Sequence, residues 1–344
     1  MSKNFSAPKI TRRAGLKLLS GGLAAGFGTY AGILSAPAVL ASDRTVIRLG
    51  APAGSVPGIK TAIEEGLFQK ENIEIELVTL AGGPNILAAT VGGSLEVGYS
   101  DLFAWVGALD NGFDLTFLQS ANGRGNSDFI IASKESGVKV PADLRGKKIG
   151  TAAHAQSKLR VTLYLEHFRI KPEDVEFVVI NQRDTVGAAL AGGQIHASIA
   201  SDPNVAQWEK QYGVIILEGR PWQQVPEKTT TAGFFSTSTW LKEEPGRAER
   251  FVRAAREGAS RYNGYSAEQK AAISLKYDKV DLFAIEKENP GVIKRMDDAN
   301  ASHSGAIDLE ATSEWLKIAA AHKTIKNVID LKPLLHSTAL AATI

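Results

Sequence analysis

The side chains best suited to chemistry in this sequence follow predicted strands, in loops that lie far apart along the chain. The candidates for contact with a ligand are Ser55, Gly82, Gly83, Ser100, Asp101, Asn122, Arg124, His154, Gln156, Asp202 and Phe234. Hydroxyls, amides, charged groups and backbone N–H groups of this kind bind small polar molecules through hydrogen bonds. The sequence contains no nucleophile elbow, no Walker loop and no histidine pair with metal-ligand spacing on one helix. The pattern therefore favours binding over catalysis, with no catalytic residue, metal or other cofactor.

Four of the candidates up to residue 101 have two interpretations each. Gly82 and Gly83 begin a predicted helix, where backbone N–H groups can bind an anion; alternatively, the glycines only form the turn. Ser55 can contact the ligand or cap its own helix. Asp101, which follows Ser100 at a strand end, is by the simpler interpretation a helix N-cap.

Two polar candidates follow the strand predicted near residues 115–119. Arg124 carries a forked guanidinium, which can pair with a carboxylate or a sulfonate through two hydrogen bonds. Asn122 can donate and accept nearby. The alternative is that Arg124 is an ordinary solvated loop residue.

The loop of residues 151–157 joins a predicted strand to a predicted helix. Free amides and the positive end of the helix dipole should therefore lie in this loop. His154 is expected to donate to an oxyanion, the alternative being an exposed loop histidine, and Gln156 belongs to the same loop.

Three further residues are candidates near the ends of later strands. Asp202 can meet an ammonium group of a ligand or cap a helix that starts at Pro203. Trp222 and Phe234 can form walls of the pocket, although buried aromatic side chains usually belong to the core.

Strands and helices alternate along the chain and would position these residues. Strand patterns at residues 46–50, 73–77 and 95–99 are separated by helix patterns that Pro57, Gly66 and the Gly92-Gly93 pair delimit. This order predicts βαβ units and a largely parallel sheet. Ligands of such sheets bind beyond the carboxyl ends of the strands, which is where the candidates lie.

An internal repeat, with its two short copies about a hundred residues apart, indicates two similar α/β lobes. Residues 88–101 and 188–202 both read as a small-residue helix, a double glycine, a short strand and a Ser-Asp pair. The alternative is that any βαβ protein repeats such a succession of helix end, glycine turn and short strand. We predict lobe I over residues 43–130 and 232–344, lobe II over residues 131–231, and a two-segment hinge that allows closure on a ligand.

The N-terminal segment resembles an export signal of the twin-arginine type. Arg12 and Arg13 precede a glycine-rich apolar stretch over residues 18–34, and residues 36–41 end in small side chains suited to cleavage after Ala41. Gly15 departs from the usual motif, so the general secretory route is the alternative. We therefore expect residues 1–41 to be a signal peptide and the mature protein to be a soluble periplasmic monomer without membrane insertion.

Composition argues against other classes of protein. The chain is 44% hydrophobic and 22% charged, which is ordinary for a globular protein. Five of its 39 basic residues lie within the first 17 positions, so the remainder has fewer basic residues than the 37 acidic ones. Nucleic-acid binding is therefore not expected. The absence of cysteine removes disulfides and thiolate metal sites.

Four stretches in register with the predicted lobes are similar to the periplasmic binding proteins for nitrate, taurine, alkanesulfonates and thiamine-precursor pyrimidines: Ile63–Ile73, Ala89–Gly98, Asp143–Gly150 and Leu190–Ala197. His196 departs from this pattern, because an acidic residue is common there. The resemblance implies the type II periplasmic-binding-protein fold, with two doubly wound α/β lobes. It also implies an ABC importer component that passes its ligand to a membrane permease and its ATPase subunit.

The sequence is compatible with several classes of ligand. We favour a small organic anion, an aliphatic or aryl sulfonate above all, because several predicted helix starts face the cleft. Nitrate, taurine, a carboxylate or a pyrimidine precursor suits the same framework, and a ligand sensor is an alternative to a transport component. An enzyme is a remote alternative, since the thiamine-pyrimidine synthases of similar fold carry a cysteine-rich motif and this chain has no cysteine.

Overall fold

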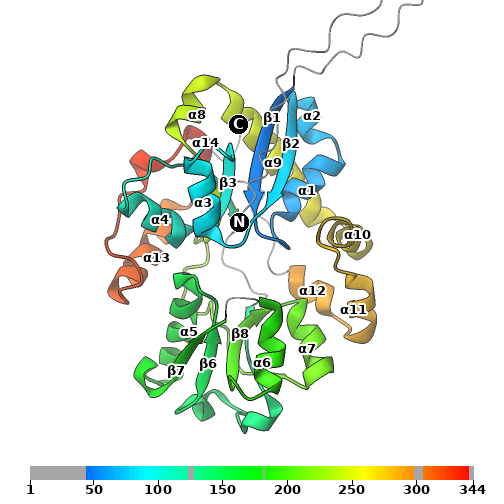
Figure 1. The fold of residues 1–344 in the computed structure, drawn as a ribbon, viewed down its shortest axis with the longest axis vertical. Helices are drawn as coiled ribbons and strands as arrows, with labels where there is room; N and C mark the ends of the chain where they lie inside the picture. The colour runs from blue at the N-terminus through cyan, green and yellow to red at the C-terminus, as the bar shows by residue number, and fades with distance from the viewer. Residues whose placement is uncertain (1–43, 123–127, 181–182, 298–304, 341–344) are drawn as a thin grey trace, which may run out of the picture. The chain divides into compact units, whose positions relative to one another are not determined.

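The computed structural model describes residues 44–122, 128–180, 183–297 and 305–340. The predicted signal peptide and Arg124 lie outside the described residues. Residues 43–344 form one compact unit, which contains two five-stranded sheets (Figure 1).

Sheet A, the sheet of lobe I, has the strand order β2-β1-β3-β10-β4. Its members are β1 (Thr45–Ala51), β2 (Ile73–Thr79), β3 (Val97–Asp101), β4 (Thr116–Asn122) and β10 (Ala232–Ser236). Strand β1 is parallel to both β2 and β3, whereas β10 is antiparallel to both of its neighbours.

Sheet B, the sheet of lobe II, repeats this plan in the order β7-β6-β8-β5-β9. Its members are β5 (Asp128–Ala132), β6 (Lys148–Thr151), β7 (Glu176–Val179), β8 (Ala197–Ser201) and β9 (Ile215–Ile216). Strand β5 is antiparallel to β8 and β9. In each sheet the antiparallel strand is the one whose chain arrives from the other lobe, so two connections join the lobes. The predicted fold class is confirmed, while the residue boundaries of the lobes stay a prediction.

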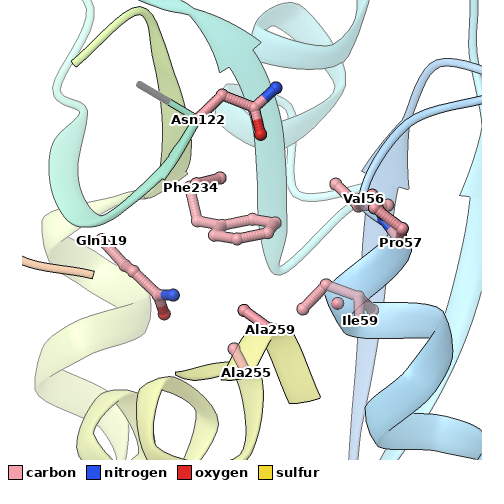
Figure 2. A pocket seen from close by; sticks show the side chains of 10 residues that line it. Val56, Pro57, Ile59, Gln119, Asn122, Phe234, Ala255 and Ala259 are labelled. Carbon is pink, nitrogen blue, oxygen red and sulfur yellow. The ribbon is translucent and has the colours of Figure 1, made fainter. Parts of the chain in front are cut away.

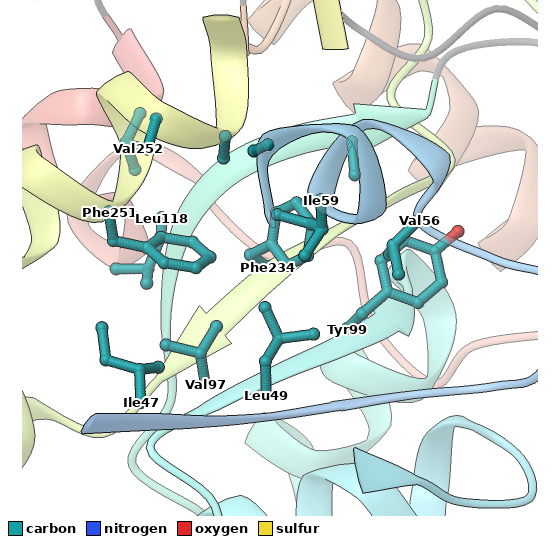
Figure 3. Close-up of a cluster of buried hydrophobic side chains, with 14 of the residues drawn as sticks. Ile47, Leu49, Val56, Ile59, Val97, Tyr99, Leu118, Phe234, Phe251 and Val252 are labelled. Carbon is teal, nitrogen blue, oxygen red and sulfur yellow. The ribbon is translucent and has the colours of Figure 1, made fainter. Parts of the chain in front are cut away.

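Helices cover both faces of sheet A. Side chains of β1 and β10 pack against α1 (Pro57–Glu64), α2 (Leu67–Lys70) and α9 (Arg247–Gly264), as Figure 3 shows for Phe234, Ile59 and Phe251. The opposite face packs against α3 (Gly83–Val91), α4 (Leu102–Asp110) and α13 (Leu309–Ala321). Strand residues alternate between these two clusters, as Phe234 and Phe235 do, because successive side chains of a strand point to opposite faces.

Sheet B is covered in the same way. Ile130 and Ala132 of β5 pack with α5 (Ala155–His167), whereas Phe129 and Ile131 pack with α6 (Val186–Ala191) and α7 (Asn204–Tyr212). Leu159 of α5 also joins the cluster of α4 and α13 on sheet A. The two lobes therefore share apolar contacts beside the connections that join them.

The remaining helices follow β10, where the sequence predicts mostly helix. They are α8 (Ser238–Glu243), α10 (Ala267–Asp278), α11 (Leu282–Glu288), α12 (Val292–Asp297) and α14 (Ser337–Leu340). Among the residues that the structure describes, no helix combines the length and the apolar character needed to cross a membrane.

The internal repeat is also found in the pairing of the strands, where equivalent residues of the two sheets differ by one hundred in number. Arg48 faces Glu76 across β1 and β2, and Lys148 faces Glu176 across β6 and β7. The backbone N–H of Arg48 donates to Glu96 Oε2 at 2.7 Å, and that of Lys148 donates to His196 Nδ1 at 2.9 Å. His196 therefore replaces the acidic residue of the pattern as a hydrogen-bond acceptor.

This imidazole makes part of the stability of lobe II depend on pH. Burial lowers the pKa of His196, and the nearby Lys147 and Lys148 lower it further. Because the folded state binds the proton less tightly than the unfolded state, the contribution is present above the usual histidine pKa of about 6.5 and is lost as pH falls through it. We expect His196→Glu, which supplies an acceptor like Glu96, to lose less stability than the wild type between about pH 7 and about pH 5 in urea unfolding.

The exposed His167 gives the control, because His167→Gln should retain the pH dependence of the wild type. If the His196→Glu variant and the wild type lose equal stability on acidification, the Lys148–His196 hydrogen bond is not the source of the pH dependence.

Candidate functional site

A pocket lies at the N-terminus of α1, between that helix, the end of β4, strand β10 and α9 (Figure 2). Its lining consists of Val56, Pro57, Gly58, Ile59, Gln119, Ala121, Asn122, Phe234, Ala255 and Ala259. Of the predicted site residues, Asn122 and Phe234 line it. The pocket brings together segments that lie about two hundred residues apart in sequence.

The walls of the pocket are mostly apolar. Phe234 is only 3% exposed and is held between the rings of Tyr99 and Phe251, with centroid distances of 5.7 and 5.6 Å. It therefore belongs to the core and the pocket at once. Such walls suit the carbon skeleton of an organic ligand.

Two amide side chains supply polar groups in the pocket. Gln119 is 1% exposed, and its Oε1 has no hydrogen-bond partner. The side chain of Asn122 donates from Nδ2 to the hydroxyl of Tyr99 at 2.9 Å. None of the described residues that line the pocket is charged. A buried amide oxygen without a partner loses its hydration for no gain, so a ligand that donates to Gln119 would relieve this loss.

The backbone at the start of α1 is strained. Val56, the N-cap of this helix, has φ 49° and ψ 49°, a left-handed conformation that is rare for a β-branched residue. Ser55 does not cap the helix; its hydroxyl donates to the carbonyl of Pro52 at 2.5 Å. The capping alternative for Ser55 is therefore wrong. Strain of this kind is frequent at sites that bind ligands.

Gly83, Ser100 and Asp101 lie together on the other side of sheet A. A Cβ atom at position 83 would lie 2.2 Å from Ser100 Oγ and 3.1 Å from Asp101 Oδ2, so only glycine allows this approach. The Ser100 hydroxyl is buried without a hydrogen-bond partner. Gly82, with φ +75°, is the N-cap of α3. The predicted anion site at this helix start therefore has a carboxyl group beside it.

Asp101 is an N-cap, as the simpler interpretation predicted. Its Oδ1 accepts from the N–H groups of Phe103 and Ala104 at 3.1 and 3.0 Å. Burial raises the pKa of Asp101, although these two N–H donors and the charge of Arg160 oppose the shift. An anion at Gly83 would therefore be repelled by Asp101 whenever this carboxyl group is ionised.

The predicted loop of lobe II also caps its own helix. His154 is the N-cap of α5, and its Nδ1 accepts from the N–H of Ser157 at 3.3 Å. This nitrogen is an acceptor, so a donor role toward an oxyanion is left to Nε2. Gln156 is 5% exposed, and its Oε1 has no hydrogen-bond partner.

Asp202 already has a cationic partner. Its carboxylate accepts from Arg295 Nε at 2.7 Å and Nη2 at 3.0 Å, and from the N–H of Ala206 in α7 at 3.2 Å. Burial raises the pKa of Asp202, while Arg295 opposes the shift. The predicted ammonium group of a ligand would have to displace this guanidinium.

The family model described as NMT1/THI5 like matches residues 55–263, which is more than half of the chain. The chain belongs to the NMT1/THI5-like family. The resemblance predicted from the four sequence stretches is therefore confirmed, and the matched residues include the pocket at α1.

Several proteins are similar to this NMT1/THI5-like chain. A Brucella abortus protein named as a binding protein is 28% identical over 73% of this chain and 77% of its own length. An Escherichia coli protein named for binding aliphatic sulfonates is 25% identical over 68% of this chain and 72% of its own.

Solved structures share the fold. The alkanesulfonate-binding protein of Xanthomonas axonopodis pv. citri, bound to MOPS, superposes with a TM-score of 0.69 at 15% identity, covering 86% of this chain and 99% of the other. A desulfurization enzyme superposes with a TM-score of 0.59 at 15% identity, covering 86% and 98%. At this identity both likenesses show the fold alone.

Two residues of this NMT1/THI5-like chain were missed as candidates. Gln119 ends the strand predicted over residues 115–119, so its place at the carboxyl end of a strand could be recognised from the sequence. The lack of a hydrogen-bond partner for its Oε1 could not. Arg160 of α5 forms an ion pair with Asp128 and lies over the ring of Trp222 at 4.4 Å. Its position four residues after Gln156, on the helix that follows the predicted loop, was the available signal.

Proposed function

We propose that this protein is the solute-binding component of an ABC importer, which captures a small organic molecule in the cleft between its lobes. In this proposal the protein works outside the cytoplasmic membrane and passes its ligand to a permease driven by an ATPase. The supporting observation is the buried Gln119, whose amide oxygen has no partner and which lines an apolar pocket at a helix N-terminus. The names of the relatives from Brucella and Escherichia coli agree with a binding protein.

We favour a sulfonate as the ligand. At the start of α1, Pro57 has no N–H, and the N–H groups of Ile59 and Lys60 donate to the carbonyl of Val56. The N–H of Gly58 and the positive end of the helix dipole are therefore what this helix offers an anion. The three oxygens of a sulfonate can accept from this N–H and from the NH₂ of an amide, and apolar walls can contact the carbon chain. A sulfonate group has no proton to donate, so a donor to Gln119 Oε1 would have to be another group of the ligand. The relative from Escherichia coli is named for binding aliphatic sulfonates, which supports the same class. Nitrate, taurine, a carboxylate or a pyrimidine precursor is the alternative.

A carrier suits this pocket better than an enzyme. The ten described residues that line it include no nucleophile and no titratable side chain, so they can hold a ligand but not transfer a proton or a covalent group. Closure around the ligand would be driven by its higher affinity for the closed form. The likeness to a desulfurization enzyme concerns the fold, which does not determine the function.

Replacing Gln119 with leucine should change stability and binding in opposite directions. Leucine removes a buried amide without a partner, so the free energy of unfolding should stay equal or rise by about 1 kcal/mol. The same change removes a hydrogen bond to the ligand and should weaken binding roughly tenfold. Urea unfolding and isothermal titration calorimetry with ethanesulfonate, MOPS, taurine and nitrate measure the two effects.

The exposed Gln207 on α7 gives the matched control, because Gln207→Leu should leave both quantities unchanged. A Gln119→Leu variant that binds as tightly as the wild type would remove this pocket from the proposal.

A further inference from the structure

The helices α10, α11 and α12 form a segment, residues 267–297, that contacts both lobes. We name it the helical strap. In Figure 1 its three helices follow one another from the side of α1 to the side of α7. The strap belongs to the part of the chain predicted with lobe I, yet Leu282, Ile285, Val292 and Ile293 share an apolar cluster with Ala206 of α7 in lobe II.

One end of the strap holds the loop that forms the pocket. Asp278, the last residue of α10, accepts from Lys60 Nζ at 2.7 and 2.8 Å and from the backbone N–H of Gly54 at 2.9 Å. The Lys60 side chain is 4% exposed. Gly54 precedes Val56 by two residues, and Val56 lines the pocket. Asp278 therefore fixes the loop on both sides of the strained residue Val56 without contacting the pocket itself.

The other end of the strap holds the β8–α7 loop and helix α7 of lobe II. Arg295 of α12 binds Asp202 through two nitrogens and reaches Glu209 at 3.3 Å. Asn289 donates to the carbonyl of Ala206 at 3.2 Å and to Glu209 at 3.0 Å. Asp202 directly follows β8, at the carboxyl end of sheet B. Planar paired contacts of this kind fix orientation more strongly than a single bond.

We propose that Asp278 and Arg295 are positioning residues for ligand capture, and that the strap couples the pocket loop of lobe I to the β8–α7 loop of lobe II. A movement of lobe II must carry the strap with it or break the Arg295–Asp202 pair. Through Asp278, either event acts on the backbone of residues 54–56. The proposal rests on the proposed function only in calling residues 56–59 part of a ligand site, because the coupling itself needs no ligand.

Hydrogen exchange of the full-length protein without ligand tests the coupling. Arg295→Met should speed exchange of the amides of residues 54–60 by roughly threefold or more, relative to exchange in α13. Arg295→Lys keeps one charge but not the paired geometry, and should give a smaller increase. The increase should appear although position 295 contacts lobe II and not the measured amides.

The matched control is Lys287→Met, which removes an exposed positive charge from α11 of the same strap and should leave this exchange unchanged. The thermal midpoint of each variant shows that it is folded. Faster exchange confined to α7 and α12 in Arg295→Met would overturn the coupling. Failure of every sulfonate to bind, with the exchange result as expected, would leave the coupling standing and reject only the favoured ligand class.

Discussion

The Asp278→Ala variant is expected to unfold with a free energy roughly 3–5 kcal/mol below that of the wild type. Asp278 is the carboxylate that Lys60 contacts at 2.7 Å, and the Lys60 side chain is 4% exposed. Alanine would leave a buried ammonium without its counter-charge, which is among the largest losses that one substitution produces. Burial already lowers the pKa of Lys60, with Asp278 opposing the shift. Urea unfolding near neutral pH measures the loss.

Substitution of the partner residue Lys60 should cause only a small loss of stability. This difference between the two variants would identify the stranded charge as the cause of the loss in Asp278→Ala. Lys60→Met replaces the ammonium by an apolar side chain of similar length, so we expect a loss of about 1 kcal/mol. The double variant should be more stable than Asp278→Ala alone. Raising the pH toward about 10 should reduce the deficit of Asp278→Ala, because the stranded lysine can then lose its proton. A loss that is equal in both single variants and independent of pH would contradict the explanation.

The Gly258→Ala variant is expected to lose roughly 3 kcal/mol of stability. A Cβ atom at this position of α9 would lie 2.2 Å from the carbonyl oxygen of Gly58 and 2.6 Å from Cβ of Ala62. The carbonyl belongs to the backbone of α1, which cannot move aside as a flexible side chain can. The helices must therefore separate, and α1 would shift at the end that lines the pocket. Denaturant unfolding and ligand affinity should both report the change.

Gly264 provides the control on the same helix. A Cβ atom there would have no neighbour within 4 Å, so Gly264→Ala should be neutral or stabilising by about 0.5 kcal/mol. If the two alanine variants are equally stable, close contact between α1 and α9 is not what requires glycine at position 258.

The fold was predictable where glycine and proline mark the ends of elements. Pro57 lies at the first turn of α1, Gly66 follows that helix closely, and Gly92 ends α3, so helix and strand types were evident. The direction of β10 was not evident. A strand of apolar residues such as Phe234 reads the same in either orientation, and only its two partners, β3 and β4, reveal that it runs antiparallel.

Part of the candidate pocket could be predicted from the sequence, but most of its members could not. The rule that ligands bind beyond the carboxyl ends of strands selects Asn122, the last residue of β4, whereas Phe234 lies in the middle of β10; both line the pocket at α1. Asp202 has its charged partner Arg295, 93 residues away in sequence, and no spacing rule links the two. Likewise, whether Gln119 has a partner depends on neighbours from several elements. Residue types indicate which groups can bind, but the tertiary contacts decide which of them are already occupied.

The most direct test of the account is thermal unfolding of the wild type and the Gln119→Leu variant with sulfonates, taurine, nitrate, aromatic carboxylates and pyrimidines. A ligand that binds only the folded state raises the midpoint of unfolding. The account predicts that one chemical class raises the midpoint of the wild type by several degrees and shifts the variant much less. Equal shifts in both proteins, or no shift with any member of the panel, would contradict ligand capture in the pocket at α1.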